Sequence, residues 1–170
     1  MFKTIAAISL AVLAVASPAQ AAERALQDAN PVQDFVLDIN DRRAAAGLST
    51  LCVSTKLKNA ADDQAYHMAT TNSITTTGAD GSTPTSRAKA QGFNFTSGVG
   101  VTERVAAGYA TAEHVLMAWS QSSAFNSTVL DPAWTHIGPG YSFNNDTQYK
   151  YYWVVDLGIS TSESCDGLVW

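Results

Sequence analysis

Residues 102–130, TERVAAGYATAEHVLMAWSQSSAFNSTVL, decide the fold of this chain. Apolar residues around Val105 predict a short strand, and Gly108 ends it. Thr111 is typical of a helix N-cap, because its hydroxyl can accept a hydrogen bond from a free backbone N–H of the first turn. The apolar residues that follow at helical spacing predict a helix with one buried face (Ala112, Val115, Leu116 and Trp119). We therefore expect a strand, a tight turn, a helix and then a polar loop.

Glu103 is the residue of this stretch that does not fit an apolar core. It is an acid inside an apolar strand, and a buried acid needs a hydrogen-bonding or charged partner. The alternative is an edge position from which the carboxylate faces water. The sequence leaves both readings open.

Three further helices are predicted before this stretch. The first begins at Asn30-Pro31, a capping residue followed by proline at the first helical position, and Gly47 stops it. Ser54 caps the second, which fades near Thr70, and Pro84 opens a short helix that runs to about Gln91. Residues 48–53 between the first two helices are expected to form a connector.

After this stretch the sequence predicts two paired strands. Residues 134–143 and 149–157 have strand composition, and Asn144-Asn145-Asp146 between them is typical of a hairpin turn. Both faces of the second strand are apolar, so layers must cover both sides of the sheet. The expected fold is α+β, a three-layer α-β-α sandwich with a small antiparallel sheet. The chain has no internal repeat and reads as one domain.

The N-terminus has the pattern of a secretory signal. Residues 1–21 contain Lys3, an apolar run and a cleavage site of small residues. The apolar run is too short to span a membrane. Residues 22–30 are expected to be a leader and residues 161–170 a C-terminal tail. We therefore expect a secreted, extracellular protein without a membrane span. The net charge of −5 argues against nucleic acid as a partner.

Two kinds of covalent modification are suggested by the sequence. An even cysteine count in a secreted chain favours a disulfide between Cys52 and Cys165, with two free thiols as the alternative. Asn94, Asn126 and Asn145 each begin an Asn-x-Ser/Thr triplet and are candidates for glycosylation, which would make the protein a glycoprotein.

The central stretch also resembles a family signature. Residues 103–108 (ERVAAG), followed by Trp119, Ser122, Phe125 and Leu130, are similar to the central motif of the CAP superfamily, the SCP or PR-1-like secreted domain. Residues 137–141 (IGPGY) and 152–158 (YWVVDLG) resemble its closing strand pair. The resemblance covers residues 32–158, implies a CAP domain over residues 31–160, and is greatest to the short single-domain microbial branch.

The resemblance also implies a cavity, built in the family from two histidines and one or two acids that in several members hold a divalent metal. The histidine positions here are Thr76 and Phe125, and of the acids Glu103 remains. We therefore expect a cavity lined by these residues, with no metal and no other cofactor. The chain's own histidines (His67, His114 and His136) are expected to have structural or surface roles. Glu103 is expected to act as a structural acceptor, with Arg43 or the hydroxyls of residues 75–77 as candidate partners.

For function, the resemblance implies a non-catalytic, monomeric secreted domain that binds a sterol, a fatty acid or a host surface protein in a host–microbe interaction. A protease-like hydrolase is the alternative, although no Gly-x-Ser-x-Gly or His-Glu-x-x-His motif is present. A third reading is a diverged paralogue that acts through its surface as an immune or adhesion ligand. We expect no enzyme activity, because the histidines of the family are replaced.

Overall fold

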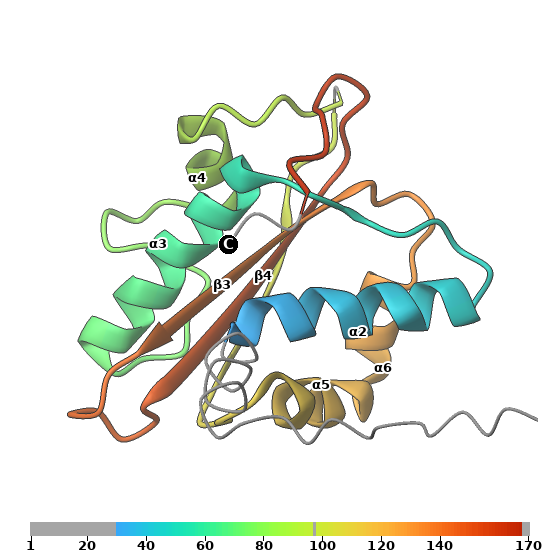
Figure 1. Ribbon diagram of the computed structural model, residues 1–170. Helices are drawn as coiled ribbons and strands as arrows, with labels where there is room; N and C mark the ends of the chain where they lie inside the picture. Colours follow the sequence, from blue (N-terminus) through green and yellow to red (C-terminus); the bar gives the residue numbers. More distant parts are fainter. Residues whose placement is uncertain (1–29, 97, 168–170) are drawn as a thin grey trace, which may run out of the picture.

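The computed structural model describes residues 30–96 and 98–167 (Figure 1). The expected signal peptide and nearly all of the leader therefore lie outside the described residues. The elements follow in the order α2 Pro31–Ala45, β1 Cys52–Val53, α3 Thr55–Thr71, α4 Pro84–Ala90, β2 Thr102–Ala107, α5 Ala112–Ser120, α6 Ser123–Val129, β3 His136–Phe143 and β4 Tyr151–Gly158.

The predicted helix starts are confirmed by their capping hydrogen bonds. The side chain of Asn30 accepts from the backbone N–H of Val32, that of Ser54 from Leu57, and that of Thr111 from His114. Each of these caps satisfies a donor that the first helical turn leaves free. The short helix predicted from Pro84 is also present, and a reciprocal pair of hydrogen bonds between Thr83 and Ser86 opens it.

Two segments differ from the expectation. The stretch predicted as a polar loop contains the helix α6, whose N-cap is Ser122. Its buried residues Phe125 and Val129 are four positions apart, a helical spacing that is easily missed among polar neighbours. Within the predicted connector, Cys52 and Val53 form the strand β1, which pairs in parallel with β3.

Within the part of the chain that the structure describes, the sheet has four strands in the order β1-β3-β4-β2. The predicted hairpin is confirmed, because β3 and β4 pair antiparallel from His136 opposite Gly158 to Phe143 opposite Tyr151. Strand β2 then pairs antiparallel with the other side of β4. The sheet is therefore mixed: an antiparallel sheet of three strands with one short parallel strand at its edge.

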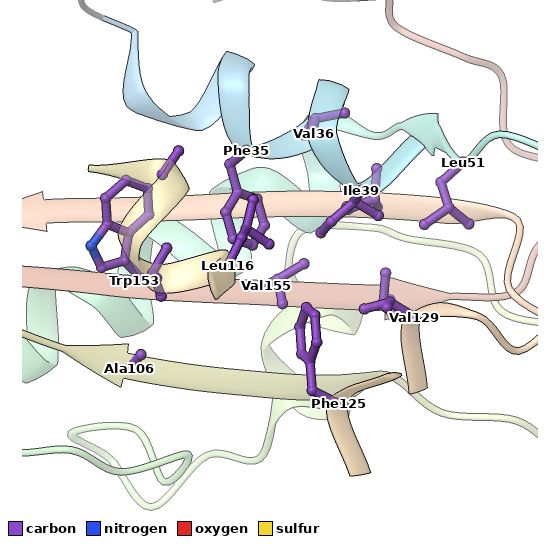
Figure 2. Close-up of a cluster of buried hydrophobic side chains, with 14 of the residues drawn as sticks. Phe35, Val36, Ile39, Leu51, Ala106, Leu116, Phe125, Val129, Trp153 and Val155 are labelled. Atoms are coloured by element: carbon purple, nitrogen blue, oxygen red, sulfur yellow. The ribbon is translucent and has the colours of Figure 1, made fainter. Parts of the chain in front are cut away.

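Helices cover the two faces of the sheet, as the predicted α-β-α sandwich requires. Figure 1 shows α3 and α4 on one side and α2, α5 and α6 on the other. Successive residues of β4 alternate between these layers: Tyr152 and Val154 pack with α3, and Trp153, Val155 and Leu157 belong to the larger cluster with α2, α5 and α6 (Figure 2). This two-sided burial explains why both faces of the strand are apolar.

Helix α3 lies unusually close to β3. A Cβ atom placed on Gly138 would come closer than 3.0 Å to the backbone of Leu57 and Lys58, and one on Gly140 closer than 3.0 Å to the backbone of Ala61. The two glycines are therefore the sites at which the helix backbone contacts the sheet. This approach fixes the height of α3 above the strands and with it the position of the residues that α3 carries.

A disulfide joins Cys52 in β1 to Cys165 in the tail, with the two Cα atoms 5.1 Å apart. The tail also contacts the start of α3, where a carboxylate oxygen of Asp166 accepts a hydrogen bond of 2.7 Å from the backbone N–H of Thr55. Glu163 accepts two hydrogen bonds of 2.9 Å from Lys56. The described part of the tail is thus held covalently and by charge against β1 and α3.

Replacing both cysteines with serine is expected to lower the free energy of unfolding by about 4 kcal/mol, because the crosslink closes a long loop. The separation of 113 residues makes this loop nearly as long as the domain. Urea denaturation of the double variant C52S/C165S measures the loss, and wild-type protein under reducing conditions is the control. An unchanged denaturation midpoint in both would contradict the expectation.

Within the described residues, no helix combines the length and apolar character needed to span a bilayer.

Candidate functional site

Two carboxyl side chains lie next to each other on the sheet face that α3 and α4 cover. Glu103 of β2 is directly opposite Asp156 of β4 in the antiparallel register. Both are on the same face as Val105 and Val154, because side chains two positions apart in a strand share a face. The Glu103 side chain is 1% exposed, and Asp156 is 0% exposed. Glu103 therefore takes the buried position that the sequence left open.

The partner of Glu103 is Arg87 of α4. The Arg87 Nη2 atom donates to Glu103 Oε2 at 2.6 Å, and Arg87 Nη1 donates to the carbonyl oxygens of Thr76 and Ser82 at 3.2 and 3.0 Å. One buried guanidinium thus joins β2 to the loop between α3 and α4. An ion pair between buried, hydrogen-bonded groups holds this geometry much more firmly than a surface pair would.

The partners that the sequence suggested for Glu103 are not the ones observed. The guanidinium of Arg43 binds the carbonyl oxygens of Ser49, Val129 and Asp131 on the other side of the sheet. Arg43 therefore fixes the ends of α2 and α6. Arg104 also points away from Glu103, as its place in the strand predicts, and donates to Thr128 of α6.

The charges of the cluster balance only if one carboxyl keeps a proton. Burial raises the pKa of Asp156 well above its usual value, and the neighbouring Glu103 raises it further. Burial also raises the pKa of Glu103, while Arg87 opposes that shift. We assign the proton to Asp156, because Glu103 is the group in contact with the guanidinium. A protonated Asp156 also supplies a donor for Glu103 Oε1, which has no other donor among the described residues.

A pocket of about 460 Å³ lies beside this cluster, between α3 and the segment that leads into α4. Most of the residues that line it have polar side chains, among them Asp63, Gln64, His67, Asp80 and Arg87, and Tyr66 lines it as well. Tyr66 is 67% exposed. Such a volume is within the usual range for small-ligand sites.

The three positions that the family resemblance assigned to one cavity do not all come together. Thr76 is exposed, and its carbonyl oxygen is linked to Glu103 through Arg87. Phe125 lies across the sheet in the larger apolar cluster, where its ring stacks on Trp119 with centroids 4.9 Å apart. Figure 2 shows the ring of Phe125 directed toward Val129 and Val155, and the residue is buried in this cluster. The structure therefore groups Thr76 with Glu103 and leaves Phe125 in the core of the opposite layer.

The three histidines lie on three different elements of the fold. His67 of α3 is half-buried on the pocket wall, and His114 of α5 is exposed. His136 of β3 is buried, its Nδ1 atom is 2.7 Å from the hydroxyl of Thr135, and burial lowers its pKa.

The metal that the family resemblance implies does not fit the residues present. Glu103 is already neutralised by Arg87, whose fixed positive charge would repel a metal cation at this carboxylate. Across residues 30–96 and 98–167, no three His, Cys, Asp or Glu side chains come together as metal ligands would. We therefore derive no chemistry through a metal.

Sequence reasoning missed Arg87 and Asp156. Asp156 had a readable signal, because it is an acid within an otherwise apolar strand, the same anomaly that drew attention to Glu103. Arg87 had none, because a basic residue on a short helix normally faces water. Only the packing of α4 against β2 brings its guanidinium to the carboxylate.

The three glycosylation candidates differ in their surroundings. Asn94 and Asn145 are exposed, whereas the side-chain nitrogen of Asn126 donates to the carbonyl oxygen of Ser120 at 2.9 Å. That nitrogen is the atom to which a glycan would be attached. Asn94 and Asn145 are therefore the more accessible candidates.

Comparison with solved structures finds domains of similar architecture. It is similar to an outer surface protein of Borrelia burgdorferi, with a TM-score of 0.66, 22% identity, and coverage of 77% of this chain and 93% of that one. It is also similar to an extracellular protein containing an SCP domain from Bacillus anthracis, with a TM-score of 0.64, 18% identity, and coverage of 75% and 40%. A cysteine-rich secretory protein from Staphylococcus aureus gives a TM-score of 0.58 at 17% identity, with coverage of 76% and 38%.

These likenesses define the fold class, a small mixed sheet between helical layers as in SCP domains. The sequence itself matches the model of the CAP family, described as the cysteine-rich secretory protein family, over residues 37–157. The chain therefore belongs to the CAP family. Comparison with curated protein sequences found no significant match.

Proposed function

We propose that the protein is a secreted CAP domain that acts by recognition and not by catalysis, and that its ligand site is the polar pocket between α3 and α4. The disulfide and the signal-like N-terminus support an extracellular location. The ligand is a small polar molecule or an exposed group of a cell-surface or host partner.

The burial and the charge balance of the carboxyl pair are the main support for this proposal. A catalytic acid or base must reach the proton that it transfers. Here Glu103 and Asp156 are buried beneath Arg87, and their proton and charge are used within the cluster. The pair therefore serves to hold Arg87, the loop and α4 in place around the pocket.

The hydrogen bonds of the Ser86 hydroxyl also support binding over hydrolysis. Ser86 lies on the wall, but its hydroxyl accepts from the N–H of Thr83 and donates to the carbonyl oxygen of the same residue. It is thus fixed as part of a helix cap. A nucleophile would instead need a hydrogen bond to a base, and His67 makes none to a hydroxyl through its ring in the described residues.

A sterol or a fatty acid is the second candidate, favoured by a separate hollow of about 460 Å³ between α2 and α5. Leu116 and Met117 give it apolar surface. Asp34, Asp38 and Glu113 also line it, and Arg42 offsets only the charge of Asp38, so the remaining negative charge opposes entry of a fatty-acid carboxylate. The charge of this hollow therefore disfavours a fatty acid more than an uncharged sterol.

Filling the pocket tests the proposal. Ala90 is an exposed residue of the pocket wall, and A90W is expected to place an indole in the space and to reduce the affinity for polar fragments at least about tenfold. Ligand-observed NMR with a set of small polar fragments measures the loss. The matched control is A44W, on the exposed surface of α2.

Three outcomes would contradict the proposal. The first is an absence of fragment binding to the wild type, and the second is an equal loss in both tryptophan variants. The third is peptide hydrolysis by the wild type that the substitution H67A abolishes, since this would indicate catalysis. Binding of the fluorescent sterol dehydroergosterol without any polar-fragment binding would favour the second candidate.

A further inference from the structure

Gln64, which lines the pocket between α3 and α4, carries a buried acceptor. The residue is 0% exposed, and its Oε1 atom has no hydrogen-bond partner among the described residues. The orientation of the amide is fixed, because Nε2 donates to the carbonyl oxygens of Thr75 at 2.5 Å and Thr77 at 3.3 Å. The free end of this side chain is therefore an oxygen that needs a donor.

Two carboxylates line the same pocket. Asp63 on α3 and Asp80 in the loop both line the pocket and are exposed. Asp63 Oδ2 accepts from Gln91, and Asp80 Oδ1 accepts from the N–H of Ser82, so each carboxylate keeps its second oxygen for a ligand. Hydrogen bonds from Ser82, together with the nearby charge of Arg87, lower the pKa of Asp80.

The remaining charges offset these two only in part. Among the described residues that line the pocket, Arg87 is the one Lys or Arg side chain; it is paired with Glu103 at 2.6 Å, and its charge also favours the ionised form of Asp80. The exposed ring of Tyr66 adds a face that attracts cations. The pocket thus combines two exposed carboxylates, an exposed tyrosine and a buried acceptor.

We propose that this pocket binds an alkylammonium group, supplied by a polyamine or by a lysine side chain of a partner. An ammonium has three donors and no acceptor, which matches two carboxylate oxygens and the oxygen of Gln64. Its alkyl stem can lie against Tyr66, as lysine stems commonly pack on apolar surface. This inference deepens the proposed function and rests on it.

Calorimetric titration of the full chain with cadaverine, with pentanediol as the uncharged analogue, tests the proposal. Cadaverine is expected to bind saturably and pentanediol not to bind. D63N and D80N should each weaken cadaverine binding about tenfold, because each removes a charged acceptor. Asn keeps an acceptor oxygen and both sites are exposed, so the variants should fold. The matched control D41N, an exposed acid of α2 in the opposite helical layer, should change the affinity by about twofold or less.

Spermidine and Nα-acetyl-lysinamide distinguish the two sources of the ammonium group, and tighter binding of either one supports the proposal. It is overturned if cadaverine does not bind, if pentanediol binds equally, or if D63N and D80N behave like D41N. If the ammonium proposal fails but polar fragments still bind the wild type and not A90W, the proposed function is retained. If the polar fragments do not bind either, both proposals are rejected.

Discussion

Alanine at Gly138 or Gly140 is expected to lower the free energy of unfolding by about 3 kcal/mol or more, and G138A/G140A is expected not to fold. A Cβ at either position would overlap the backbone of α3, which is a part of the helix that cannot rotate aside as a side chain can. Relief would require the whole helix to rise from the sheet. The core residues of α3, such as Leu57 and Met68, would then lose their contacts with the strands.

Denaturation monitored by circular dichroism measures this loss in the single variants. S142A is a suitable control, because Ser142 lies in the same strand but is only half-buried, and removing its hydroxyl adds no atom. The free energy of unfolding of this control should lie within about 0.5 kcal/mol of the wild-type value. If G138A and G140A were as stable as S142A, the close packing of α3 on β3 would not be the contact that fixes the two layers.

The helices and the hairpin could be predicted because their signals are local. The caps at Asn30, Ser54 and Thr111 act within three residues, and the turn after Phe143 lies between its two strands. Helix α6 was missed because it has only two buried positions among polar residues. The strand β1 is two residues long and depends on pairing with a strand more than eighty positions away, so nothing local marks it.

The candidate site was only partly predictable for the same reason. Glu103 is conspicuous in its own strand, but the groups that give it a role come from two other elements, α4 and β4. Alignment to the family signature also grouped Phe125 with Glu103, although the sheet separates them. A signature records positions along the chain, and it does not record which face of the sheet each one occupies.

Removing the charge of Arg87 is the second change with a large expected effect. R87M leaves Glu103 buried without a cation, and this is expected to lower the free energy of unfolding by about 3–5 kcal/mol at neutral pH. The substitution also leaves the carbonyl oxygens of Thr76 and Ser82 without their donor. The matched control is K89M, which removes the same charge from an exposed position of the same short helix and should cost about 0.5 kcal/mol or less.

Because Glu103 and Asp156 share one proton, either carboxyl group can serve as the anion beside Arg87. In E103Q, Asp156 is expected to lose its proton and become the partner of Arg87, while in D156N the pair of Glu103 and Arg87 is kept. Each single variant should therefore lower the free energy of unfolding by less than half as much as the double variant E103Q/D156N, in which the guanidinium has no anionic partner. Urea denaturation of the four proteins gives the coupling energy as a double-mutant cycle. Additive costs would contradict the shared proton.

The pH dependence of stability gives an independent test of the same assignment. The pKa of Asp156 is raised in the folded protein, so its contribution to stability is complete below the unfolded value of about 4. The contribution is lost as the pH rises from there through the raised pKa, because folding must then retain a proton that the unfolded chain has released. D156N has no such proton, and its stability relative to the wild type should increase between about pH 4 and pH 8. A difference that stays constant over this range would show that Asp156 is ionised in the folded protein, and the cluster would then need a second cation.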